Sequence, residues 1–77
     1  MKSKRIVFRS VNDLYRFNKE ATKCKTEVRI KTKSGLYEFD AKTILGLFFV
    51  LHLTDVEVLY HEEEIEFDNY LNYMEAA

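Results

Sequence analysis

The 77-residue chain has no proline, no tryptophan, two glycines and a single cysteine. One cysteine excludes an internal disulfide and any metal site that needs several thiolates. Two glycines do not make a glycine-rich phosphate-binding loop. No apolar run approaches the roughly 18 residues of a membrane span, and no apolar segment follows the charged residues 1–9 as it would in a signal peptide. We therefore expect a soluble cytoplasmic domain with a reduced thiol.

A chain of this length makes one small domain, which we place at residues 1–77. Its residues are 47% hydrophobic and 32% charged, whereas disordered chains combine few apolar residues with a large net charge. A domain of this size buries only about 60% of the surface that its unfolded chain exposes. There is little room for a deep cleft.

Charge is divided unevenly along the chain. Residues 1–33 hold eleven cations and three acids, and residues 34–77 hold one cation, Lys42, and ten acids. A basic half can bind nucleic acid or an acidic protein, but the two halves of a small domain can also complement each other. No basic–aromatic stacking pattern accompanies the cations. A small nucleic-acid-binding domain stays the alternative function, and its contact residues would be Arg5, Arg9, Arg16, Lys19 and Lys23.

The first third of the chain predicts a strand and a helix. Residues 5–9 favour a strand because Ile6, Val7 and Phe8 are β-branched or aromatic. Residues 10–13 are rich in helix N-cap types and indicate where a helix begins. Apolar side chains then recur at helical spacing and should face a core: Leu14, Phe17, Ala21 and Cys24. We expect Cys24 to pack at the end of this stripe rather than to act as a nucleophile.

The middle of the chain predicts a hairpin and a second helix. Residues 27–33 alternate, with Val28 and Ile30 on one face of a strand. Residues 33–35 form a turn in which Gly35 can take a positive φ, and residues 36–40 return as the partner strand. Residues 43–51 are almost entirely apolar and predict a helix, which Thr43 would cap through the Gly46 amide.

The last third predicts one more strand and a closing helix. Residues 55–60 alternate, and Phe67, Tyr70, Leu71 and Met74 follow helical spacing. The complete order, β-α-β-β-α-β-α, predicts an α+β fold. In it, helices cover a single face of one antiparallel four-stranded sheet.

This order, taken with the segment Asp40-Ala-Lys-Thr-Ile-Leu-Gly-Leu47, resembles the histidine-containing phosphocarrier (HPr) family of the bacterial sugar phosphotransferase system. The family has a similar Lys-Ser-Ile-Met-Gly-Val segment at the start of its second helix. The resemblance extends over nearly the whole chain, although the closely matching motif is short. It implies an HPr-like open-faced sandwich.

Thr43 stands where the family's segment carries its regulatory serine, so the resemblance makes Thr43 a phosphorylation candidate. A hydroxyl at a helix N-terminus leaves amide donors beside an added phosphate, and the helix dipole favours the negative charge. The alternative is that Thr43 only caps the helix, a role worth roughly 1 kcal/mol.

The family's carrier histidine lies in a Gly-Ile-His-Ala-Arg-Pro-like loop between the first strand and the first helix. An ungapped alignment puts Ser10 at the place of the histidine and Asn12 at the place of the arginine. Phosphoryl relay needs a nucleophile that forms a high-energy phosphoramidate, whereas a serine ester would keep its phosphate. We expect the carrier chemistry to be absent; a degenerate carrier acting through Ser10 is the competing hypothesis.

No other residue takes over from the missing histidine. His52 follows the predicted second helix, and His61 follows the last strand beside three glutamates. Neither lies in the family's loop, and their separation differs from the i, i+4 spacing of helical metal ligands. Without a convergent acid–base pair or nucleophile, we expect no enzyme activity, no catalytic residue, no metal and no cofactor.

A binding surface is the function that remains. Residues 43–51 are apolar on more sides than one core-facing stripe requires, so part of this helix either fills the core or meets a partner. Family members dock kinases and regulators with their first two helices. The resemblance therefore implies a docking set of Ile44, Leu45 and Phe48, with Arg16 and Lys19 at its rim. The partner would be a phosphotransferase-system kinase or regulator, and the apolar helix is also compatible with a homodimer.

Overall fold

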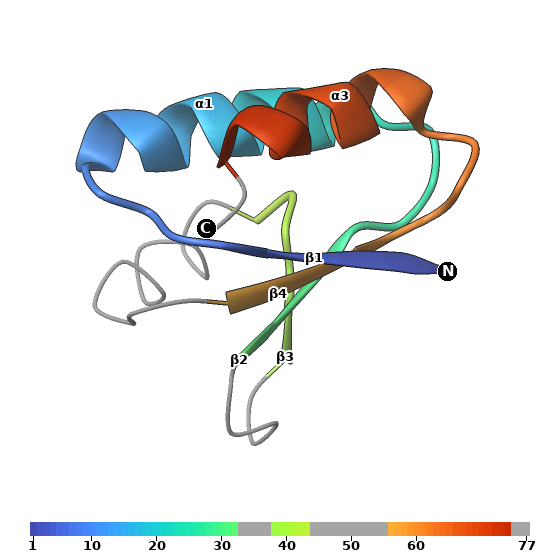
Figure 1. Ribbon diagram of the computed structural model, residues 1–77, viewed down its shortest axis with the longest axis horizontal. Coiled ribbons are helices and arrows are strands. Elements are labelled where there is room, and N and C mark those ends of the chain that lie inside the picture. Colours follow the sequence, from blue (N-terminus) through green and yellow to red (C-terminus); the bar gives the residue numbers. More distant parts are fainter. Residues whose placement is uncertain (33–37, 44–55, 75–77) are drawn as a thin grey trace.

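The computed structural model describes residues 1–32, 38–43 and 56–74. Two helices lie side by side on one face of a four-stranded sheet (Figure 1). The predicted α+β class, the antiparallel sheet and the placement of these helices are therefore confirmed. The elements are β1 (Lys2–Ile6), α1 (Val11–Thr22), β2 (Arg29–Thr32), β3 (Glu38–Asp40), β4 (Val56–Tyr60) and α3 (Ile65–Met74).

The strands lie in the order β1-β4-β2-β3, and every neighbouring pair is antiparallel. The last strand in sequence thus lies between the first and the second. Its Val56 is opposite Ile6 on one side and Thr32 on the other. The side chains of Ile6, Val56 and Thr32 are all buried, so this row across three strands forms part of the core.

Alternation along each strand separates a core face from an outer face. On β2 and β4 the inward residues are fully buried, as Ile30 and Val58 are. The outer face instead carries opposite charges on adjacent strands, a pairing that stabilises sheets. The row across all four strands is Arg5, Glu57, Lys31 and Glu38. Cations of the basic half therefore stand opposite acids of the other half in the folded domain.

The core lies between the sheet and the two helices. Phe17 on α1 is fully buried, with its ring centroid 5.2 Å from that of Phe8 and 5.7 Å from that of Phe67 on α3. Phe67 in turn meets the ring of Tyr60 on β4 at 5.6 Å. The helical stripe predicted from sequence is confirmed, because Leu14, Phe17, Ala21 and Cys24 are all buried.

The strand predicted at residues 5–9 was placed three residues too late. β1 is Lys2–Ile6, because it pairs residue by residue with β4 from Lys2 opposite Tyr60 to Ile6 opposite Val56. Residues 7–9 have left the sheet and lead into α1, where Phe8 packs against Phe17. A β-branched and aromatic run is thus shared between a strand and the connection after it.

The other predicted strands differ from the observed ones mainly at their ends. Residues 27–33 contain β2, and residues 55–60 contain β4. β3 lies at the end of the predicted strand 36–40. The turn at Gly35 and the second helix after Thr43 lie outside the described residues.

Candidate functional site

Ser10, one of the site residues predicted from the sequence, is the N-cap of helix α1. The Ser10 backbone is extended, and its hydroxyl oxygen accepts a hydrogen bond from the Asp13 backbone N–H at 3.2 Å. The Asp13 carboxylate accepts one from the Arg9 N–H at 3.1 Å. The first interaction satisfies a donor that a helix start would otherwise leave unpaired, and the second ties the residue before the cap to the first turn. Ser10 therefore acts as an N-cap, and the predicted Asn12 lies exposed in the first turn of the helix.

Thr43 lies exposed at the end of a turn that follows β3. Its backbone N–H donates to the Asp40 carbonyl at 3.1 Å. The N–H of Lys42 donates to the Asp40 carboxylate at 2.9 Å, and the N–H of Ala41 donates to the Val28 carbonyl at 2.9 Å. The backbone that carries Thr43 is therefore fixed to the sheet. The predicted contact of its hydroxyl with the Gly46 amide lies outside the described residues.

Helix α1 holds the same turn from the other side. The Asn18 side-chain amide donates to the carbonyls of Ala41 at 3.4 Å and Lys42 at 3.2 Å. The Lys42 ammonium donates to the Cys24 carbonyl, just beyond the end of α1, at 3.0 Å. These contacts place the Thr43 turn beside the helix. Sequence analysis missed Asn18, although an asparagine inside a predicted helix signals that its side chain has another partner.

The predicted docking set is described only in part. Arg16 and Lys19 both lie exposed on α1, one turn apart. Ile44, Leu45 and Phe48 lie outside the described residues. The structure therefore brings the two predicted rim cations onto the helix that holds the Thr43 turn, and the apolar half of the surface stays a prediction.

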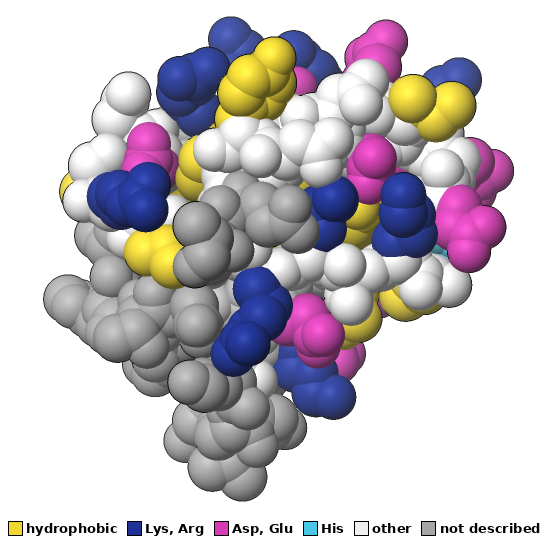
Figure 2. Space-filling view, viewed as in Figure 1, with side chains coloured by type: hydrophobic (Ala, Val, Ile, Leu, Met, Phe, Trp, Pro, Cys, Tyr) yellow, Lys and Arg dark blue, Asp and Glu magenta, His cyan; other side chains and the backbone are white. Residues whose placement is uncertain are grey.

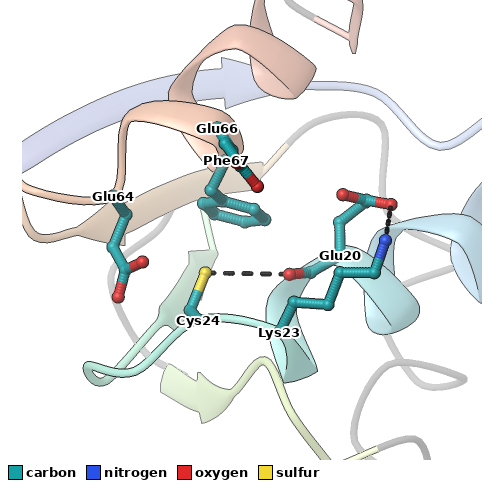
Figure 3. A pocket seen from close by; sticks show the side chains of 6 residues that line it. All are labelled: Glu20, Lys23, Cys24, Glu64, Glu66 and Phe67. Carbon is teal, nitrogen blue, oxygen red and sulfur yellow. Dashed lines mark hydrogen bonds and ion pairs between the residues drawn. The ribbon is translucent and has the colours of Figure 1, made fainter.

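Cys24 lines a hollow of about 40 Å³ between the end of α1 and the start of α3 (Figure 3). Its thiol donates to the Glu20 carbonyl at 3.7 Å, and its side chain is 8% exposed. Burial and, to a smaller extent, the nearby Glu64 carboxylate raise the pKa of the thiol to about 11. A thiol with this pKa stays protonated at neutral pH and is a poor nucleophile. The prediction that Cys24 packs at the end of the α1 stripe is confirmed.

Two carboxylates attach α3 to the rest of the domain. Glu64 accepts hydrogen bonds from the hydroxyl and, at 2.8 Å, the backbone N–H of Thr26. Asp68 accepts one from the Tyr60 hydroxyl and pairs with the Lys2 ammonium at 3.2 Å. Hydrogen bonds from Thr26 and from Tyr60 lower the pKa of Glu64 and of Asp68 respectively.

His61 lies half-buried after β4, with its Nδ1 atom 3.9 Å from the Glu63 carboxylate. With Met1, Glu62 and Glu63 it lines an open hollow. Within residues 1–32, 38–43 and 56–74, no three His, Cys, Asp or Glu side chains are grouped so that they could hold a metal ion. His52 lies outside these ranges.

The cations proposed for nucleic-acid binding are distributed over two elements and their flanks. Arg9, Arg16, Lys19 and Lys23 are exposed on α1 and beside it, whereas Arg5 belongs to β1. Lys23 pairs with Glu20 at 3.2 Å. Figure 2 shows several cations gathered over the helix layer and carboxylates at the edge where α3 begins. The basic surface is therefore bounded by acidic side chains.

Comparisons with protein-family models, with curated proteins and with solved structures find no match to this chain. Among the helices that the structure describes, none has both the length and the apolar character to cross a membrane.

Proposed function

We propose that this chain is an HPr-like protein of the phosphotransferase system that lacks the carrier histidine and has a regulatory, protein-binding role. The observation that carries the proposal is the position of Thr43. Its side chain is exposed, its backbone is fixed by Asp40, and its turn lies against α1. A kinase can reach a hydroxyl in such a place, and a partner that contacts the turn also meets α1.

Ser10 supports the part of the proposal that excludes a phosphate relay. Its hydroxyl already caps α1 through the Asp13 N–H, and an alcohol ester of phosphate is a poor donor for onward transfer. The domain would therefore act by binding, without a catalytic residue or cofactor of its own.

Phosphorylation at Thr43 would change the local charge sharply. The Thr43 oxygen forms a bond to the γ-phosphorus of ATP as the bond to the ADP oxygen breaks, and the hydroxyl proton passes to a base of the kinase. The product carries about −1.5 to −2 charge at neutral pH. It lies next to Lys42, in a turn that Asn18 holds against α1, the helix that also carries the exposed cations Arg16 and Lys19. A partner that distinguishes the two forms would respond to this change of charge.

Intact-mass analysis after incubation with ATP and the family's serine kinase tests the proposal. One phosphate should appear on the wild-type chain and on the matched control Ser10→Ala, and none should appear on Thr43→Ala. A wild-type chain that takes up no phosphate would reduce Thr43 to a helix cap. Acid-labile phosphate after incubation with phosphoenolpyruvate and Enzyme I, lost in Ser10→Ala, would show a carrier and contradict the proposal.

Nucleic-acid binding is the second candidate function, and the exposed cations around α1 favour it. Binding through phosphate contacts releases counterions, so the affinity for any oligonucleotide would fall steeply as salt rises. Fluorescence anisotropy with a labelled oligonucleotide at low and high salt measures this dependence. The variant Arg16→Ala with Lys19→Ala should weaken such binding, and an absence of binding at low salt would eliminate this function.

A further inference from the structure

The turn before Thr43 consists of two consecutive peptide groups, each held at both of its edges. The group that joins Ala41 to Lys42 has its oxygen on the Asn18 side-chain amide and its N–H on the Asp40 carboxylate. The group that joins Lys42 to Thr43 has its oxygen on the same amide and its N–H on the Asp40 carbonyl. Because a peptide group is planar and rigid, two opposed contacts fix its orientation.

We infer that Asn18 is a positioning residue that couples Thr43 to helix α1, so that a charge introduced at Thr43 is sensed along this helix. The inference rests on the proposed function only in that phosphorylation would be the natural source of the charge. Asp40 belongs to β3 and Asn18 to α1, so the turn is held between the sheet and the helix layer. Of these two residues that hold the peptide groups of the turn, Asn18 is the one that belongs to a helix.

Helical spacing identifies where the coupling should be detected. Val11, Tyr15 and Thr22 are seven, three and four residues from Asn18, and therefore lie on the same side of α1. Val11 is 44% exposed and Tyr15 is 52% exposed. Lys19 and Arg16 lie further around the helix. A change at Thr43 should therefore affect Tyr15 and Thr22 more than Arg16.

A second contact makes the turn responsive to charge. The Lys42 ammonium donates to the uncharged Cys24 carbonyl at 3.0 Å. A carboxylate or phosphate at position 43 would offer this ammonium a charged acceptor on the neighbouring residue, and charge-assisted hydrogen bonds are roughly twice as strong as neutral ones. Lys42 would then shift toward residue 43, and the carbonyls that Asn18 holds would move with it.

Backbone NMR of the full chain tests the coupling with Thr43→Glu as the probe. In the wild-type background, this substitution should shift the Asn18 side-chain amide signals and the backbone amides of Tyr15 and Thr22. In an Asn18→Leu background, which keeps the side-chain size but removes the donors, the α1 shifts should disappear while the shift at Lys42 remains. Amide exchange at Thr43 should also become about fivefold to tenfold faster in Asn18→Leu.

Asn12→Leu is the matched control, because Asn12 is exposed on the same helix. It should leave the shifts at Tyr15 and Thr22 intact. Equal shifts in α1 with and without the Asn18 amide would overturn the inference. If Asn18→Leu does not fold, the wild-type chain decides: an Asn18 side-chain amide that is unaffected by Thr43→Glu overturns the coupling.

The kinase experiment and the NMR experiment fail independently. A chain that takes up no phosphate but shows the coupling contradicts the proposed function and leaves the role of Asn18 in place. A chain that is phosphorylated at Thr43 without any effect on α1 supports the proposed function and contradicts the coupling through Asn18.

Discussion

The two helices are attached to the rest of the domain by different chemistry. α3 is held at its start by Glu64 on Thr26, and within its first turn by Asp68 on Tyr60, Lys2 and Lys4. Outside its buried stripe, α1 is attached to the Thr43 turn by the neutral amide of Asn18 and, just beyond its end, by the Lys42 ammonium on the Cys24 carbonyl. The attachment of α3 therefore depends on ionised carboxylates, and that of α1 does not.

Because of this difference, α3 has a constant attachment, whereas the attachment of α1 can respond to a charge at Thr43. Carboxylates with lowered pKa values stay ionised through the neutral range, so the contacts of α3 are constant there. The Asn18 amide of α1 instead donates to the carbonyls of Ala41 and Lys42, which directly precede the exposed Thr43. A charge added at Thr43 therefore acts on the side of the domain that holds α1, while α3 keeps its position.

The largest effect on stability should come from removing Phe17, the buried ring of α1 that also contacts α3. Phe17 is fully buried and its ring contacts Phe8 and Phe67, so Phe17→Ala should lower the free energy of unfolding by about 3–5 kcal/mol. Urea denaturation measures this loss. The control Tyr73→Ala removes a side chain that is 91% exposed, and should change stability by about 0.5 kcal/mol or less. Similar losses in the two variants would contradict the described core.

Lowering the pH should loosen the attachment of α3. Because the pKa values of Asp68 and Glu64 are lowered in the folded protein, their contribution to stability is present above the unfolded pKa values. It should decline below about pH 5, as the pH falls toward the folded pKa values. Asp68→Asn should cost about 1 kcal/mol at pH 7 and flatten this decline. Urea denaturation from pH 7 to pH 2 checks both, with Glu66→Gln, an exposed glutamate on the same helix, as control. An unchanged acid profile in Asp68→Asn would assign the decline to other carboxylates.

The smallest effect concerns the hydroxyl of Tyr70 on α3. The Tyr70 hydroxyl is buried and has no hydrogen-bond partner among the described residues, and burial raises the pKa of this group to about 12. Removal of a buried, unpaired polar group can be stabilising. Tyr70→Phe should therefore leave the free energy of unfolding unchanged or raise it by up to about 1 kcal/mol. Thermal unfolding of this variant beside the exposed control Tyr73→Phe measures the difference, and a clear loss of stability would reveal a partner for the hydroxyl.

Patterns that depend on neighbouring residues were predicted well. Helical spacing placed Leu14, Phe17, Ala21 and Cys24 on one buried stripe, and alternation placed Val28 and Ile30 on the inner face of the sheet. The limits of the first strand were not predictable in this way. Residues 2–4 are polar or charged, and they become a strand only because β4 provides their pairing partners.

The features of the candidate site likewise differ in whether they depend on adjacent residues or on distant partners. The segment around Thr43 and the serine at position 10 can be read from the sequence, because each involves only a few adjacent residues. Asn18 and Asp68 could not be assigned roles, since their partners are distant along the chain. Asn18 meets carbonyls 23 and 24 residues away, and Asp68 meets ammonium groups at the opposite end of the chain.

The sequence by itself therefore determined which apolar stripes of α1 and of the strands face the core and which side-chain chemistry stands at positions 10 and 43, because hydrophobic periodicity and residue type can be read from neighbouring residues. Only the tertiary structure decided that β4 lies between β1 and β2, that carboxylates secure α3, and that one amide of α1 holds the Thr43 turn. These features depend on long-range pairing. A hydrogen bond between distant residues forms only after the packing of apolar faces has brought its donor and acceptor together.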